Sequence, residues 1–311
     1  FFFFFFFLGK QLPPILSRRD RDSLQNGKPW SPVVRMNRSS NLLDEAIGLE
    51  DQLSPSTPLT GRIVLIEDCV ETSGAFVLHH LIVRSLSSPS AGIVIFVAFS
   101  QPFYHYERIL RKLGCNLLAQ KETNNLFFID MHMLHSLEGH GGNAEDGLAG
   151  LYGKIQKIVE GVPESRRTRV LVMIDDISLL EVVADGSSNL VVDFLHYCET
   201  LTSEFGCSLV LLNHGDIYSS MERPALKSQM EYRSDILIKA EPLATGSAND
   251  VHGQLTVRNK GGRDESRGQA LRNFQFRIRE KGVEYFYAGS RREFLLLATN
   301  MEKLYYRYQL R

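Results

Sequence analysis

Residues 61–76, GRIVLIEDCVETSGAF, decide the fold of this chain. A β-prone run, Arg62-Ile-Val-Leu-Ile-Glu67, is followed by a short polar turn and then by a helical pattern from about Ser73 to Ser85. Because the run is continuously apolar and does not alternate, it is typical of a strand in a parallel sheet that helices cover on both faces. The segment therefore predicts the first strand–turn–helix unit of an α/β fold.

The alternation of strand and helix continues through the middle of the chain. Further strands are expected at 92–98, 126–129, 169–174, 207–212 and 235–239, with helices at 104–112, 148–159 and 190–204. After residue 251, apolar and polar residues alternate at 254–258, 273–279 and 283–287, and loops are expected at 139–147 and 259–269. This alternation predicts antiparallel hairpins, the last one turning at Lys281-Gly282. The predicted fold is a doubly wound, largely parallel α/β sheet that C-terminal hairpins extend.

The N-terminal residues differ in texture from the rest of the chain. The apolar run at 1–8 is too short to span a membrane, which takes roughly 20 residues. Its basic residues follow the run, whereas in a signal peptide they precede it, and the first methionine is Met36. We therefore expect 1–35 to be a non-native leader, 36–60 an N-terminal lead-in, 61–289 the folded domain and 290–311 an atypical C-terminal tail. We expect no membrane partner.

Charge and cysteine content narrow the class of protein. Lys plus Arg (35) nearly equals Asp plus Glu (36), so bulk charge argues neither for nor against a nucleic-acid partner. The four cysteines are scattered without a CxxC pair, which is typical of reduced thiols in the cytosol or the nucleus. His132, His135 and His140 lie near one another but lack the spacing of a zinc site, so we expect neither a metal nor a cofactor.

The turn after the first strand lies where a phosphate-binding loop would lie. Such a loop needs GxxxxGK[ST]: its backbone N–H groups cradle phosphates, its Lys neutralises them and its hydroxyl binds Mg²⁺. Gly74 occupies the second glycine position, but Ala75 takes the Lys place and Phe76 the hydroxyl place. Three nearby acids would repel a triphosphate, namely Glu67, Asp68 and Glu71. The pattern predicts a degenerate P-loop, although an ordinary turn that never bound nucleotide would read the same.

Two further strand ends carry polar residues of the kind that NTPases use. The strand at 170–174 ends in Asp175, which has the form of a Walker B carboxylate, and the strand at 209–212 ends in Asn213-His214. With the lead-in 42–48, these segments resemble RecA- and KaiC-type ATPases. The resemblance implies a RecA-like fold in which Asn213 and His214 replace a sensor pair.

The same resemblance extends to the second strand and the helix after it, and implies a lost catalytic base. Ser100 or Gln101 stands where those ATPases have a catalytic Glu. Longer sequence segments indicate a more specific family, and they lie at 64–74, 194–198, 208–214, 238–243, 249–257 and 273–278. Together they resemble the Elongator complex protein 6 family, its plant form above all, from Leu42 to about Gly289.

That resemblance implies a function and a set of partners. The chain is expected to be a non-catalytic pseudo-ATPase in a hexameric ring with Elongator subunits 4 and 5, two copies of each. The ring is expected to bind tRNA, to dock on the catalytic subcomplex and to support modification of the wobble uridine. The expected location is the cytoplasm, and also the nucleus.

A basic segment near the predicted hairpins is a candidate for RNA contact. Residues 254–281 hold eight basic and three acidic side chains, and basic side chains neutralise phosphates whatever the base sequence. The candidate contacts are Arg258, Lys260, Arg263, Arg267 and Arg272; a solvated charged loop is the alternative. Two other functions stay open: an active KaiC- or RecA-type NTPase, and a module that binds a small ligand in the vacated cleft.

Overall fold

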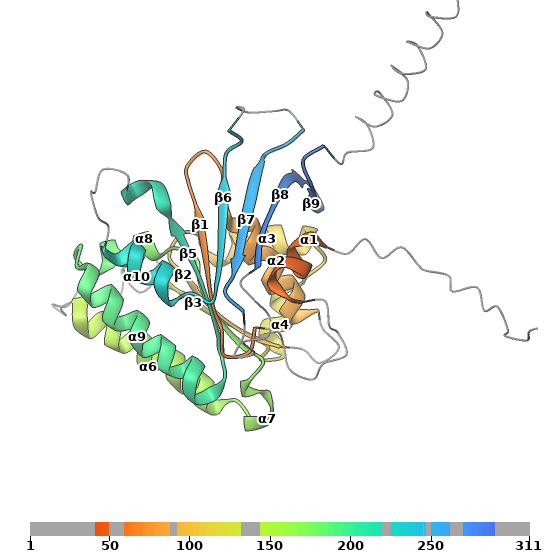
Figure 1. Cartoon of the computed structure of the whole chain (residues 1–311). Helices are drawn as coiled ribbons and strands as arrows, with labels where there is room; N and C mark the ends of the chain where they lie inside the picture. Colours follow the sequence, from red (N-terminus) through yellow and green to blue (C-terminus); the bar gives the residue numbers. More distant parts are fainter. Residues whose placement is uncertain are drawn as a thin grey trace, which may run out of the picture. The chain divides into compact units, whose positions relative to one another are not determined.

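Among the residues that the structure describes, nine strands form a single sheet (Figure 1). The computed structural model describes residues 41–49, 59–87, 92–131, 144–218, 225–244, 246, 250–261 and 270–289. All of them belong to one compact unit, Ser40–Arg311. The strand order is β3-β2-β4-β5-β1-β6-β7-β8-β9. Neighbours from β3 to β6 are parallel, and those from β6 to β9 are antiparallel.

The order of elements alternates strands and helices, as expected for parallel neighbours that need a crossover. The strands are β1 (Ile63–Asp68), β2 (Ile93–Ala98), β3 (Leu126–Asp130), β4 (Val170–Ile174), β5 (Ser208–His214), β6 (Ile236–Glu241), β7 (Gly253–Asn259), β8 (Ala270–Arg279) and β9 (Gly282–Phe286). The helices are α1 (Leu42–Ile47), α2 (Ala75–Leu86), α3 (Phe103–Lys112), α4 (Leu117–Glu122), α6 (Ala144–Gly161), α7 (Glu164–Arg167), α8 (Ile177–Val183), α9 (Ser188–Phe205), the 3-10 helix η1 (Gly215–Tyr218) and α10 (Ala225–Arg233). The expected α/β class, largely parallel with antiparallel C-terminal strands, is confirmed.

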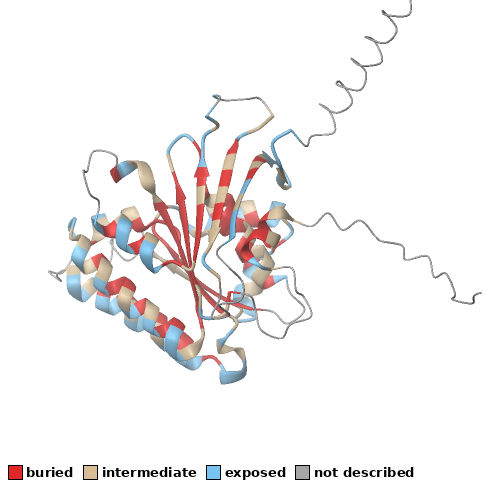
Figure 2. Cartoon of the chain, viewed as in Figure 1, coloured by how far each residue is buried: buried red, intermediate tan, exposed pale blue. Residues whose placement is uncertain are grey.

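Helices cover both faces of the parallel part of the sheet, and each face has its own hydrophobic core (Figure 2). Helices α1 to α4 pack on one face, and α6, α8, α9 and α10 on the other. Every residue of β1, β2 and β4 is buried. A strand between two helical layers meets apolar side chains on both sides, which explains why these strands are continuous apolar runs.

The antiparallel strands contribute to the core on one face only. In β7, Leu255 and Val257 are fully buried in the core beside α1 and α2, whereas Gln254, Thr256 and Arg258 are half-buried. This period of two is the alternation seen at 254–258 in the sequence. The C-terminal part of the sheet therefore offers a polar face.

Two expectations about turns and loops were wrong. Arg279 pairs with Gly282, so the residues of the last turn are Glu280 and Lys281, and Gly282 already begins β9 with a φ of 153° that glycine tolerates. The loop expected at 139–147 overlaps α6, which begins at residue 144. Two acidic residues in the first turn of α6 favour a helix N-terminus and outweigh the nearby glycines. Residues 139–143 lie outside the described part of the chain.

The sequence also left several short elements unpredicted. They are α4, α7, α8, α10 and η1. Each contains at most nine residues, too few to show a clear helical period of apolar residues. Asn259 was expected in a loop but ends β7 and pairs with Ala270.

Candidate functional site

The candidate site lies at the carboxyl ends of the neighbouring strands β1, β5 and β4, the edge at which open α/β sheets bind ligands. Asp68 ends β1, His214 ends β5, and Asp175 follows β4 directly. Parallel pairing sets Asp68 opposite His214 and Glu67 opposite Asn213. Strand register thus assembles the polar residues that the sequence singled out.

The loop between β1 and α2 is closed on itself. The N–H of Cys69 donates to the carbonyl of Thr72 at 3.4 Å, and the N–H of Thr72 donates back to the carbonyl of Cys69 at 3.0 Å. The N–H of Val70 donates to the carboxylate of Asp216 at 2.9 Å. A phosphate-binding loop turns such N–H groups toward its ligand. Here they are already bonded inside the protein.

The three motif positions lie at the start of α2. Gly74 is buried at the N-cap, and its N–H donates to Asp68 at 2.7 Å, so the protein's own carboxylate meets the helix end that binds phosphate in other proteins. Ala75 is half-buried. Phe76 is 8% exposed, and its ring centroid lies 4.6 Å from that of Phe276 in β8. The hydroxyl position of the motif is therefore a hydrophobic anchor between α2 and the antiparallel strands.

His214 connects the loops that follow β1 and β4. Its Nδ1 lies 2.5 Å from Oδ1 of Asp68, and its Nε2 lies 3.2 Å from Oδ2 of Asp176. Hydrogen bonds to Asp176 and Asp68 raise the pKa of His214 to about 10, because both carboxylates favour the imidazolium. Asp176 also caps α8 by accepting the N–H of Leu179 at 3.0 Å. A protonated histidine thus stands between two acids at the strand ends.

Asp175, the expected Walker B carboxylate, is 3% exposed and contacts the segment after β2. It accepts the N–H of Phe99 at 2.6 Å, the N–H of Ser100 at 3.1 Å and the hydroxyl of Tyr106. Burial raises the pKa of Asp175 to about 6, although these hydrogen bonds oppose the shift. Both carboxylate oxygens have donors within the chain, and Gln101 is exposed beside them. The arrangement joins β4 to the β2–α3 segment.

Asn213, the other expected sensor residue, is fully buried. Its Oδ1 accepts the hydroxyl of Tyr218 at 3.3 Å, and its Nδ2 has no hydrogen-bond partner among the described residues. Asn213 therefore lies beneath the surface of the site, whereas His214 is partly exposed above it.

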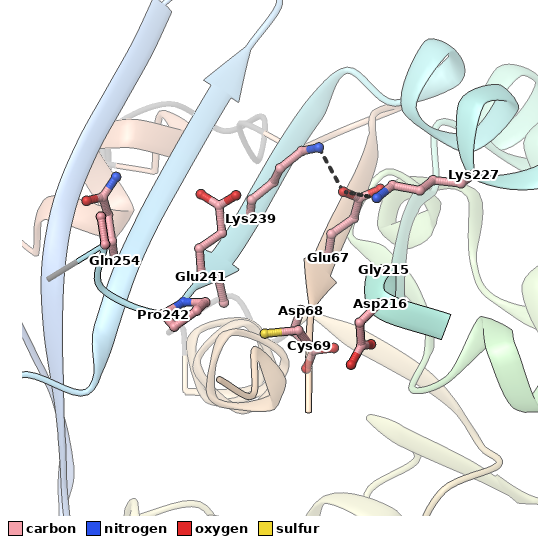
Figure 3. Close-up of a pocket in the computed structure, with 12 residues that line it drawn as sticks. Glu67, Asp68, Cys69, Gly215, Asp216, Lys227, Lys239, Glu241, Pro242 and Gln254 are labelled. Atoms are coloured by element: carbon pink, nitrogen blue, oxygen red, sulfur yellow. Dashed lines mark ion pairs between the residues drawn. The ribbon is translucent and has the colours of Figure 1, made fainter. Parts of the chain in front are cut away.

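A pocket of about 520 Å³ lies beside these residues, between the ends of β1 and β6, η1, α10 and β7 (Figure 3). Glu67 lies between two lysines: Nζ of Lys239 is 2.9 Å and Nζ of Lys227 is 3.8 Å from its Oε2. Lys239 also bonds Glu231 at 2.8 Å. Burial raises the pKa of Glu67, although Lys239 opposes the shift. Sequence reasoning missed both lysines, because only strand register and α10 bring them to Glu67.

The candidate RNA contacts do not form one cluster among the described residues. Arg272 pairs with Glu45 of α1, and Lys260 donates to two backbone carbonyls of α10 at 2.7 and 3.0 Å. Arg258 is half-buried on β7. Arg263 and Arg267 lie outside the described residues. Two of the candidates therefore already make contacts within the fold.

The described ranges hold neither a cluster of metal ligands nor a membrane-spanning helix. Within them, no group of three or more His, Cys, Asp or Glu side chains could hold a metal ion. None of the helices in these ranges is long and apolar enough to cross a membrane. His132, His135 and His140 lie outside the described residues.

Sequence comparison places the chain among proteins of one family. Residues 49–280 match the family model described as Elongation complex protein 6. The Elongator complex protein 6 of Homo sapiens is 30% identical over 76% of this chain and 94% of its own length. That of Mus musculus is 30% identical with the same coverage, and that of Dictyostelium discoideum is 21% identical over 75% of this chain and 92% of its own. The likeness to the plant form stays a prediction.

Structural comparison identifies the fold. A KaiC-like protein from Pyrococcus horikoshii OT3 has a TM-score of 0.51 and 12% identity, over 73% of this chain and 90% of its own. The flagellar accessory protein FlaH from Methanocaldococcus jannaschii has a TM-score of 0.54 and 16% identity, over 80% of this chain and 97% of its own. Such low identity supports a shared fold alone. The predicted RecA-like fold is confirmed.

Proposed function

This chain belongs to the Elongation complex protein 6 family, and on that premise we propose that it is a non-catalytic, RecA-like subunit of the Elongator complex. It joins subunits 4 and 5 in a hexameric ring that contains two copies of each. The ring docks on the catalytic subcomplex, binds tRNA and supports modification of the wobble uridine. It acts in the cytoplasm and in the nucleus.

The observation that carries the non-catalytic role is the internal use of the loop between β1 and α2. The N–H groups of Val70 and Gly74 donate to the protein's own carboxylates. Asp68 and Asp176 share the charge of His214. A triphosphate would have to displace these contacts without a Lys at position 75 or a metal-binding hydroxyl at position 76. The polar groups at the strand ends therefore stabilise the fold and do not bind nucleotide.

The ring follows from the way that RecA-type folds associate. Such protomers contact one another head to tail, and heterologous contacts of this kind close into rings when the rotation permits. One protomer's surface then closes its neighbour's cleft. In this arrangement the basic segment between β7 and β8 contributes phosphate contacts to tRNA.

The two rival functions would both use the carboxyl-end edge of the sheet, but at different residues. An active NTPase would need an unconventional phosphate site, because Ala75 and Phe76 supply neither charge nor a metal ligand. A small-ligand module is favoured by the pocket around Glu67, which does not overlap the motif positions. A module that binds a small ligand is compatible with membership of the complex. An active NTPase would contradict the non-catalytic role.

Calorimetric titration of the purified chain with MgATP, together with an ATPase assay, tests the proposal. We expect neither binding at micromolar nucleotide nor turnover. Asp175→Asn is the matched variant, because an Asn carbonyl can still accept the N–H of Phe99 while lacking the charge a metal needs. Turnover by the wild-type chain that Asp175→Asn abolishes would refute the non-catalytic role and favour the NTPase.

A further inference from the structure

A buried carboxylate in the pocket has an oxygen that no described residue bonds. Glu67 is 4% exposed, and its Oε2 alone receives Lys239 and Lys227. Its Oε1 has no hydrogen-bond donor among the described residues, because the neighbouring Glu231 carboxylate, which interacts with Glu67, can only accept while it is ionised. Buried polar atoms in folded proteins are nearly always paired, so an oxygen of this kind indicates a donor from outside the described chain.

A second acid of the same pocket shows the same feature. Asp216 in η1 accepts the N–H of Val70 through Oδ2. Its Oδ1 is buried and has no partner in the described part of the chain. Glu67 of β1 and Asp216 of η1 thus both line the pocket, and each keeps one buried carboxylate oxygen without a partner among the described residues.

The charge of the pocket favours a cation. Its acidic lining residues are Glu67, Asp68, Asp216 and Glu241, and its basic ones are Lys227 and Lys239. His214 neutralises Asp68, but Lys239 is shared between Glu67 and Glu231. Three lining acids and Glu231 therefore face two lysines. The excess negative charge disfavours phosphate and favours a positively charged group.

We propose that this pocket binds an organic cation with several N–H donors, a guanidinium or an alkylammonium group. Such a group can donate to Glu67 and to Asp216 in charge-assisted hydrogen bonds. Ala240, Pro242 and Ala244 line the same cavity and offer apolar contact to an alkyl stem. The volume of about 520 Å³ suits a small ligand. Binding of such a cation goes beyond the proposed role in the ring, because residues of this one chain form the whole lining described for the pocket.

The cation can come from two sources, a free amine or an arginine side chain of a partner protein. Titration calorimetry of the full chain distinguishes them with agmatine as the free cation and acetyl-Gly-Arg-Gly-amide as the side chain. The same peptide with citrulline is the neutral control, because citrulline keeps the shape and loses the charge. Inorganic phosphate tests the opposite charge.

We expect both cations to bind and the citrulline peptide not to bind. Glu67→Gln should weaken cation binding at least tenfold, and Asp216→Asn should weaken it too. Glu71 is an exposed acid of the loop between β1 and α2 and does not line the pocket, so Glu71→Gln should change cation binding less than twofold. A peptide that binds more than tenfold tighter than agmatine assigns the pocket to a partner's arginine; otherwise a free amine is the ligand.

Three results would overturn the proposal. They are citrulline binding equal to arginine binding, phosphate binding in place of both cations, and no heat from either cation with wild-type protein. Circular dichroism of each variant without ligand shows whether it folds. If Glu67→Gln does not fold, Asp216→Asn carries the test alone. A failed titration leaves the ATP experiment and the family membership untouched.

Discussion

His214 lies between two carboxylates from different loops, and its charge links the ends of three strands. Asp68 ends β1, Asp176 lies two residues after β4, and His214 ends β5. A neutral imidazole has only one N–H donor, so only the protonated ring can donate to both acids at once. At this level, the imidazolium is an internal cation that the polar residues at three strand ends share.

The pH dependence of stability should report this cation. The pKa of His214 rises from 6.5 to about 10 on folding, so its stabilisation is complete below pH 6.5 and is lost as the pH rises through 10. Charge-assisted hydrogen bonds contribute roughly 1.5–3 kcal/mol, although partial exposure reduces this. The melting temperature of His214→Gln should therefore lie several degrees below wild type at pH 6 and should approach it near pH 10. A difference in melting temperature between the two proteins that stays constant with pH would contradict a charged His214.

The first turn of helix α2 packs on the antiparallel strands. Phe76 contacts Phe276 of β8 and Tyr285 of β9, with ring centroids 4.6 and 6.4 Å apart. Leu78 and Leu81 of the same helix are buried against the sheet. At the scale of the element, the first turn of α2 serves the core, and this leaves no hydroxyl for a metal ion.

Restoring the motif should therefore damage the protein. Removing a buried Phe side chain costs roughly 3–5 kcal/mol, so Phe76→Thr should lower the melting temperature by roughly 6–20 °C. Ala75→Lys should change it little, since that position is half-buried and a Lys at a helix N-terminus costs only about 0.3–1 kcal/mol. Scanning calorimetry of both single variants and the double variant measures this. A Phe76→Thr protein that is as stable as wild type and binds MgATP would contradict the role of Phe76 as a hydrophobic anchor.

The whole molecule divides its sheet between two kinds of surface. The parallel part is buried by helices on both faces, whereas β7 to β9 contribute to the core on one face and bear polar residues on the other. The segment 260–269, which includes Lys260, Arg263 and Arg267, lies between β7 and β8 in the sequence. Among the described strands, those of the antiparallel extension turn a polar face away from the core.

Binding of tRNA by the assembled complex should depend on that segment. Reversing Arg263 and Arg267 to Glu should weaken affinity and lower the slope of log affinity against log salt, by about one for each lost phosphate contact. Lys154→Glu with Lys157→Glu, two exposed positions on α6, makes the same charge change elsewhere and serves as control. Filter binding at several salt concentrations measures both. Equal loss in the two double variants would show that only net charge matters.

Local sequence was sufficient for the elements that are buried on both sides. Residues 63–66, 93–98 and 170–174 lie in strands because each is an apolar run with no polar face, and helices on both sides are the only way to bury it. The sequence also shows directly that position 75 is not Lys and that position 76 has no hydroxyl. Short elements such as α8 and α10 were missed, because few residues carry little periodicity.

Tertiary structure alone decided what the polar residues do. Asp68 and His214 are 146 residues apart, and Glu67 meets Lys239 only because β1 pairs with β6 in that register. Strand order and register arise from the packing of all layers together, and no local pattern encodes them. The sequence therefore determined which side chains stand at the strand ends. Folding determined that Asp68 and His214 neutralise each other, and that one oxygen of Glu67 has no partner among the described residues.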